Sequence, residues 1–151
     1  MTGGCTGVGS EAPARGAREA GGRAIGVTFL GMSGNPHLSS TIDCSTVGGI
    51  SLSLEEQLGL HLGTLLTADA FIVAAGGGLG TLVELLAILK LHTKHWGGKS
   101  KKVVVLRTAY SGPGWDYGMV STLARWCGTR ADLLEVYFVQ TPHEAVKIIT
   151  P

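Results

Sequence analysis

A run of glycines followed by two polar residues lies directly after an apolar segment near the middle of the chain. Residues 68–75 are mostly apolar, and Thr81 and Glu84 then begin a leucine-rich stretch. Glycine allows an anion to approach the backbone closely. The free amides and the positive end of a helix attract that anion. We therefore expect a phosphorylated ligand to contact Gly77, Gly78, Gly80 and Thr81.

Glu84 has two interpretations. A carboxylate can stabilise an oxocarbenium-like sugar or activate water while a glycosidic bond breaks, which makes Glu84 the candidate catalytic residue. The spacing Thr81-x-x-Glu84 also fits a capping box, in which Thr81 accepts a hydrogen bond from the N3 amide and Glu84 accepts one from the N-cap amide. The sequence leaves both interpretations open.

A second glycine-rich stretch begins the chain. Gly3, Gly4 and Gly7 precede a segment with helical character, so they are further candidates for phosphate binding. No metal is expected, because His92 and His95 have no cysteine or carboxylate nearby. No dinucleotide cofactor is expected either, since an opening strand with GxGxxG and an acidic residue about 20 positions later is not visible.

Length and composition limit the class of protein. The 151 residues suit a single domain, and a net charge of +1 gives no electrostatic case for binding nucleic acid or an anionic membrane. The longest apolar window, residues 58–75, contains His61, Gly63 and Asp69, which argues against a membrane span. The three cysteines form no CxxC motif and are typical of reduced thiols, so we expect a cytoplasmic protein.

Helical and strand patterns alternate along the chain, which predicts an α/β fold with a parallel sheet covered on both faces. Ser10 is the expected N-cap of the first helix, and residues 31–53 have a polar, turn-rich composition. We expect strands at 24–30, 68–75, 103–107 and 135–139, and helices at 11–20, 54–67, 81–93, 119–127 and 142–149.

Residues 76–84, GGGLGTLVE, resemble the PGGxGTxxE signature of the LONELY GUY family, often labelled lysine decarboxylase-like, with Gly76 in place of the proline. Residues 3–8 and 21–27 are similar to that family's earlier glycine loop and next strand. The resemblance implies a Rossmann-like three-layer domain over residues 1–151. It also implies a homodimer that hydrolyses nucleoside 5′-monophosphates, among them cytokinin riboside 5′-monophosphates, to base and ribose 5-phosphate without a cofactor. A related branch, the molybdenum cofactor carriers, binds a phosphorylated pterin without this chemistry.

The sequence departs from the family at an Arg-Lys pair, whose places fall on Leu60 and His61. Leucine has no hydrogen-bond donor for a phosphate. Three hypotheses follow: a nucleotide-binding relative of the phosphoribohydrolases, a non-enzymatic carrier or sensor of a phosphorylated small molecule, and a truncated copy that binds nothing.

A second departure lies at the start of the chain. The family has a strand and a helix before its first glycine loop, whereas here that loop begins at Gly3. We therefore expect the domain to lack the family's first one or two strands, with Met1 a late start. In the order 3-2-1-4-5-6, the strands predicted at 24–30 and 68–75 would then lie on either side of a gap.

Overall fold

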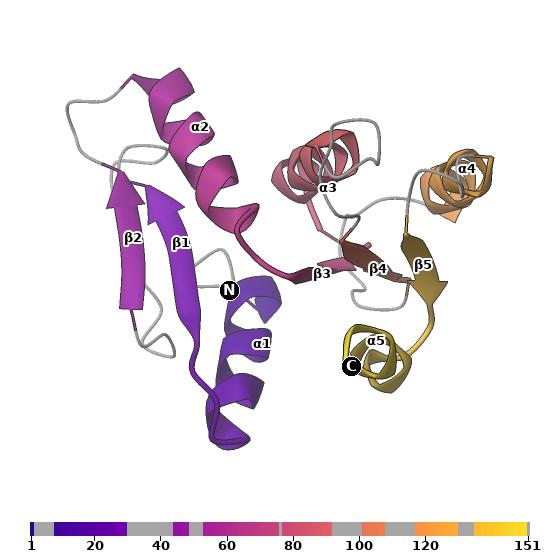
Figure 1. Cartoon of the computed structure of the whole chain (residues 1–151), viewed down its shortest axis with the longest axis horizontal. Coiled ribbons are helices and arrows are strands. Elements are labelled where there is room, and N and C mark those ends of the chain that lie inside the picture. Colours follow the sequence, from indigo (N-terminus) through magenta and orange to yellow (C-terminus); the bar gives the residue numbers. More distant parts are fainter. Residues whose placement is uncertain are drawn as a thin grey trace. The chain divides into compact units, whose positions relative to one another are not determined.

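The computed structural model describes residue 1 and residues 8–29, 44–48, 53–75, 77–91, 101–107, 117–129 and 135–150. They form an α/β structure whose described strands all pair in parallel, as the sequence predicts. The chain divides into two compact units, Met1–Ala68 and Asp69–Pro151, and each is described by itself (Figure 1). The single domain over residues 1–151 stays a prediction.

The first unit contains a two-stranded sheet. Strand β1 (Ile25–Phe29) pairs in parallel with β2 (Cys44–Gly48), and Ile25 is the partner of Cys44. Helix α2 (Leu54–Leu65) contacts both strands, and Val27 is 1 % exposed. Strand β2 was not expected, because the sequence predicts no strand in residues 31–53, whose composition is polar and turn-rich. Its sequence, CSTVG, has little apolar character of its own, so pairing with β1 determines its conformation.

Helix α1 (Val8–Glu19) begins earlier than expected, so Ser10 lies inside the helix and is not its N-cap. Its end agrees with the sequence. Gly21 has a φ of 77°, a left-handed conformation that favours glycine. The Gly21 amide donates to the Arg18 carbonyl (2.9 Å) and the Gly22 amide to the Ala17 carbonyl (2.8 Å), the two bonds of a Schellman motif.

The second unit contains a three-stranded parallel sheet in the order β3-β4-β5. Its strands are β3 (Ala70–Ala74), β4 (Lys102–Leu106) and β5 (Val136–Val139). Central strand β4 is buried on both faces, because Val103, Val104 and Val105 are each no more than 2 % exposed. Outer strand β3 is less covered, and Ile72 is 45 % exposed. All three strands overlap the predicted segments.

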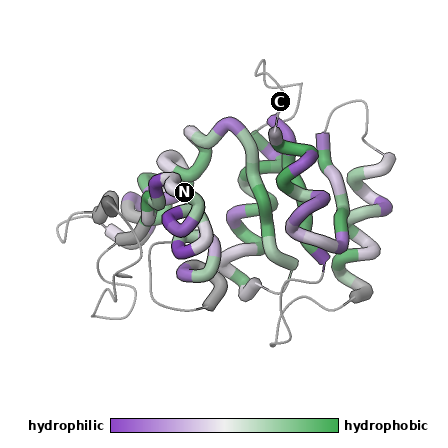
Figure 2. The backbone as a smooth tube through the Cα atoms, turned by 90° about the horizontal axis from the view of Figure 1, so that it is seen from below, coloured by the Kyte–Doolittle hydropathy of each residue, from purple (hydrophilic) through white to green (hydrophobic). Residues whose placement is uncertain are grey.

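Helices cover both faces of this sheet. Figure 1 shows α3 (Leu79–Leu91) and α4 (Tyr117–Gly128) on one face and α5 (Pro142–Ile149) on the other. Each helix carries both hydrophobic and hydrophilic residues along its length (Figure 2). The core beneath α5 consists of Val104, Leu106, Val139 and Ala145, with Ile148 and Ile149 packed against it. The unit therefore has the helix, sheet and helix layers that the sequence predicts.

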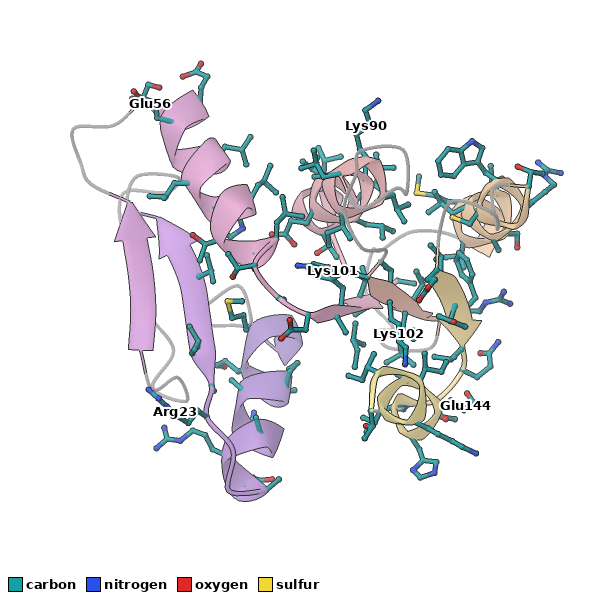
Figure 3. All side chains as sticks on the ribbon, viewed as in Figure 1. Arg23, Glu56, Lys90, Lys101, Lys102 and Glu144 are labelled. Carbon is teal, nitrogen blue, oxygen red and sulfur yellow. The ribbon has the colours of Figure 1, made fainter. Side chains whose placement is uncertain are left out.

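Both ends of α5 are fixed by side chains. At the start, the Glu144 carboxylate accepts from the Thr141 and Gln140 amides (both 2.9 Å), and Thr141 Oγ1 accepts from the Glu144 amide (3.2 Å). At the end, Lys102 Nζ of β4 donates to the Ile148 carbonyl (2.7 Å), and its side chain points toward α5 in Figure 3. A cation at a helix C-terminus also interacts favourably with the helix dipole.

Strand β1 pairs with β2 in one sheet, and β3 belongs to the other, with β4 and β5. The expected absence of the family's first strands stays a prediction. Among the described residues, no helix is long and apolar enough to cross a bilayer.

Replacing glycine by alanine in and after α1 should change stability in opposite directions. Gly21→Ala forces an L-residue into a positive φ and should lower the free energy of unfolding by about 1 kcal/mol. Gly16→Ala, inside α1 with open space at its Cβ position, should raise it by about 0.5–1 kcal/mol. Urea unfolding measures both, and equal effects of the two substitutions would contradict the assigned helix end.

The capping box of α5 should make stability depend on pH. The Thr141 amide, then the Gln140 amide and the Thr141 hydroxyl, hold the pKa of Glu144 below its ordinary value. This stabilisation is complete above the unfolded pKa of about 4.3 and is lost as pH falls through the lower folded pKa. Glu144→Gln keeps an acceptor that does not titrate, so its stability deficit relative to wild type should shrink in acid. Urea unfolding across pH 2–7 measures the difference, and a constant deficit would contradict the assignment.

Candidate functional site

The carboxyl ends of parallel strands meet at one edge of a sheet, where open α/β proteins bind ligands. At this edge of the second unit, the ladder between β3 and β4 continues one residue beyond β3, because the Ala75 amide donates to the Leu106 carbonyl (3.0 Å). The chain then turns sharply, and the Gly77 amide donates to the Ala74 carbonyl (3.0 Å). This turn places the glycine segment at the edge where the sequence predicts a ligand.

Helix α3 begins at Leu79, two residues before the predicted start. The Leu82 amide is the donor to the Gly78 carbonyl (3.2 Å), which makes Gly78 the N-cap residue. The amides of Leu79, Gly80 and Thr81 precede this bond and have no acceptor within the helix. They are the groups that an anion at a helix N-terminus binds.

This start overturns the capping-box interpretation of Thr81 and Glu84. Thr81 is the third residue of α3, so it is not the N-cap, and Glu84 is the sixth residue, in the second turn. Glu84 is partly buried and lies on the same side of the helix as Gly80 and Thr81, which are four and three residues before it. Its backbone therefore lies about one helical turn beyond the amides at the helix start.

The glycines at the start of α3 differ in whether the fold requires glycine at their positions. A Cβ at Gly77 would lie 2.5–2.7 Å from side-chain atoms of Thr81, so the contact with Thr81 requires glycine there. A Cβ at Gly78 or Gly80 would meet nothing within 4 Å, and neither residue has a positive φ. Both are exposed. These two glycines therefore leave open space beside the helix amides, and the described fold does not itself require them.

The structure brings five predicted site residues together on the turn after β3 and the first turns of α3. They are Gly77, Gly78, Gly80, Thr81 and Glu84. The other predicted phosphate contacts, Gly3, Gly4 and Gly7, lie outside the described residues, as does Gly76.

The two residues at the family's Arg-Lys places belong to α2, in the first unit. Leu60 is 50 % exposed and His61 is partly buried. The histidines His92 and His95 lie outside the described residues. Within the described part of the chain, no group of three or more histidine, cysteine, aspartate or glutamate residues could hold a metal ion.

Arg107, which the sequence analysis did not select, follows β4 at the same edge. Its amide donates to the Val139 carbonyl (2.9 Å), and its guanidinium carbon lies 5.4 Å from the centre of the Phe138 ring. The signal that could have found it is simple. Arg107 is the first polar residue after the apolar run 103–106, and such a residue in a parallel sheet lies at the carboxyl edge.

A comparison with models of known protein families found no match to this chain, and a search of curated proteins found none either. The resemblance of residues 76–84 to the LONELY GUY signature therefore remains a prediction from the sequence. The geometry at the start of α3 is the evidence from which function must be argued.

Replacing each of the two glycines before α3 by alanine should distinguish a glycine in close contact from one beside open space. Gly77→Ala should lower the free energy of unfolding by about 1–3 kcal/mol, because its Cβ overlaps the Thr81 side chain. Gly78→Ala is the matched control and should change it much less, since its Cβ enters open space. Urea unfolding measures both. If Gly77→Ala were as stable as Gly78→Ala, the close contact between Gly77 and Thr81 would be wrong.

Proposed function

We propose that this chain binds a nucleoside 5′-monophosphate, with its phosphate at the start of α3. The observation that carries the proposal is the open space that Gly78 and Gly80 leave at the carboxyl edge of a parallel sheet. The helix amides beside this space have no acceptor within the helix. A phosphate fits the amides and the positive end of the helix.

The position of Glu84 is compatible with an anion at this site. A helix rises about 1.5 Å per residue, so Glu84 lies about 7.5 Å along the axis from Leu79. A carboxylate three residues closer, as in the capping-box interpretation, would repel a phosphate more strongly. The observed helix start therefore places the backbone of Glu84 further from the proposed phosphate position than a capping box would.

The same separation suits a hydrolase. We propose that a water molecule attacks C1′ of the ribose as the bond between C1′ and the base nitrogen breaks. The base leaves with a proton, and ribose 5-phosphate is the second product. Glu84 would stabilise the positive charge that develops on the sugar or accept a proton from the water. This assignment is supported by its place on the side of α3 that also carries Gly80 and Thr81.

The alternative is a carrier or sensor that binds a phosphorylated small molecule without cleaving it. Leu60 favours this function, because half of its side chain is exposed at the place of the family arginine and it has no donor. A carrier needs the phosphate site of α3 but not a catalytic Glu84. The two functions therefore make different predictions for the same substitution.

The proposal includes a homodimer and a cytoplasmic location. Helix α3 exposes apolar side chains at Leu79, Val83 and Leu86, which lie on one side of the helix and suit a contact between copies. Cys127 is a buried free thiol, and burial raises its pKa. A protonated, protected thiol of this kind suits a reducing compartment.

Ligand binding and cleavage should be measured together. AMP and ribose 5-phosphate should raise the Tm, since a ligand at 100 times its Kd stabilises the folded state by about 2.7 kcal/mol. A phosphoribohydrolase should also release adenine from AMP, and Glu84→Gln should slow the release by about 100-fold or more while AMP still raises the Tm. Binding without release would support the carrier instead.

A matched pair of glycine variants locates the binding. Gly80→Val fills the open space beside the helix amides and should reduce the Tm increase, whereas Gly63→Val, on exposed α2, should not. Both positions are helical and uncrowded, so their effects on folding should be similar. The proposed phosphate position would be wrong if AMP stabilised both variants equally.

A further inference from the structure

We propose that Arg107 is the residue that supplies positive charge to the phosphate of the bound ligand. This inference rests on the proposed function, because it concerns the same carboxyl edge of the sheet. The pairing of β3 with β4 places Arg107 beside the glycine turn. The Ala75 amide donates to the carbonyl of Leu106, and Arg107 is the next residue. Neighbouring strands lie about 4.8 Å apart, so an arginine side chain can span the distance from β4 to the end of β3.

The side chain of Arg107 lies on the face of the sheet that carries α3. Residues along a strand alternate between faces, and Leu106 is part of the core beneath α5. Arg107 therefore projects to the opposite face, together with Phe138, whose ring it contacts. The amides of Gly80 and Thr81 belong to the helix on this same face.

The guanidinium is not fully bonded. Its carbon lies 5.4 Å from the centre of the Phe138 ring of β5, while Arg107 Nε is buried and has no hydrogen-bond partner among the described residues. To bind a phosphate at the start of α3, the side chain must therefore turn from β5 toward β3. A buried donor without an acceptor costs folding stability. A phosphate oxygen would remove that cost, and a guanidinium can bind phosphate with two parallel bonds.

Other described cations of the second unit lie elsewhere. Lys101 and Lys102 are at the amino end of β4, and Lys102 donates to the end of α5. Lys90, Arg125 and Lys147 lie in the last turns of α3, α4 and α5, which return to the amino ends of the strands. His143 is at the carboxyl edge but in the first turn of α5, which covers the opposite face. Among the described residues of the second unit, Arg107 is therefore the permanently charged cation on the α3 face of the carboxyl edge.

The test measures the affinity of the whole chain for inorganic phosphate, ribose 5-phosphate and AMP by calorimetry, with adenosine as the ligand that lacks phosphate. Arg107→Gln should weaken binding of all three phosphorylated ligands by about 10- to 100-fold. Arg107→Lys, which keeps charge but loses the paired donors, should lie between this variant and wild type. Arg125→Gln is the control and should bind as wild type does, because Arg125 is exposed on α4.

A second readout does not require a stable Arg107 variant. The NMR cross peak of the Arg107 Nε–Hε group should move when inorganic phosphate is added to wild-type protein. The affected cross peak is assigned to Arg107 because it is absent from the spectrum of Arg107→Lys, or from that of Arg107→Gln if the lysine variant does not fold. A peak that stays in place at saturating phosphate would overturn the inference.

The outcomes separate this inference from the proposed function. If Arg107→Gln bound AMP as tightly as wild type, the role of Arg107 would be wrong and the nucleotide site would stand. If wild type bound inorganic phosphate and ribose 5-phosphate through Arg107 but did not bind AMP, the role would stand and the nucleotide function would be wrong. If none of the phosphorylated ligands bound, both would be wrong.

Discussion

Burial of β4 on both faces is the constraint on which the second unit depends. Its valines and Leu106 have almost no contact with solvent, so the strand needs a pairing partner on each side and a helical layer above and below. Helix α5 supplies one layer, and Lys102 links the start of β4 to the end of that helix. Because β3, β4 and β5 are parallel, this arrangement brings the turn after β3 and the residue after β4 to one edge. The candidate site is a consequence of this packing.

Sequence pattern predicted the elements whose own composition determines them. The apolar runs at 70–74 and 103–106 lie in strands β3 and β4, and α5 has the predicted bounds because Pro142 begins it and its apolar residues repeat with helical spacing. Strand β2 was missed because CSTVG carries no such pattern and pairing with β1 determines it. The start of α3 was misplaced because Thr81 is a favourable N-cap, yet the turn at Gly77 lets the helix begin at Leu79.

The candidate site was also predicted only in part, because only part of it has a local signal in the sequence. Glycines after an apolar strand are a local signal, and the structure does bring Gly77, Gly78, Gly80 and Thr81 to the end of β3. Sequence spacing did not separate Gly77, which the contact with Thr81 requires, from Gly78 and Gly80, which adjoin open space. The sequence could have placed Arg107 at the carboxyl edge, because it follows the apolar run 103–106, but not beside the glycine turn. Arg107 becomes a neighbour of the glycine turn only through the pairing of β3 with β4, which no local pattern specifies.

The proposed phosphate site and the core that positions it belong to one unit. The glycine turn, the start of α3 and Arg107 are all placed by the β3-β4-β5 sheet, whose central strand is closed to solvent on both faces. Helix amides and a guanidinium recognise a phosphate irrespective of what is attached to it. Affinity for phosphate can therefore persist when a residue elsewhere changes, as at Leu60, whereas cleavage of a glycosidic bond also requires the sugar to be oriented toward Glu84. Of the two properties proposed for this chain, phosphate binding therefore depends on fewer groups than hydrolysis does.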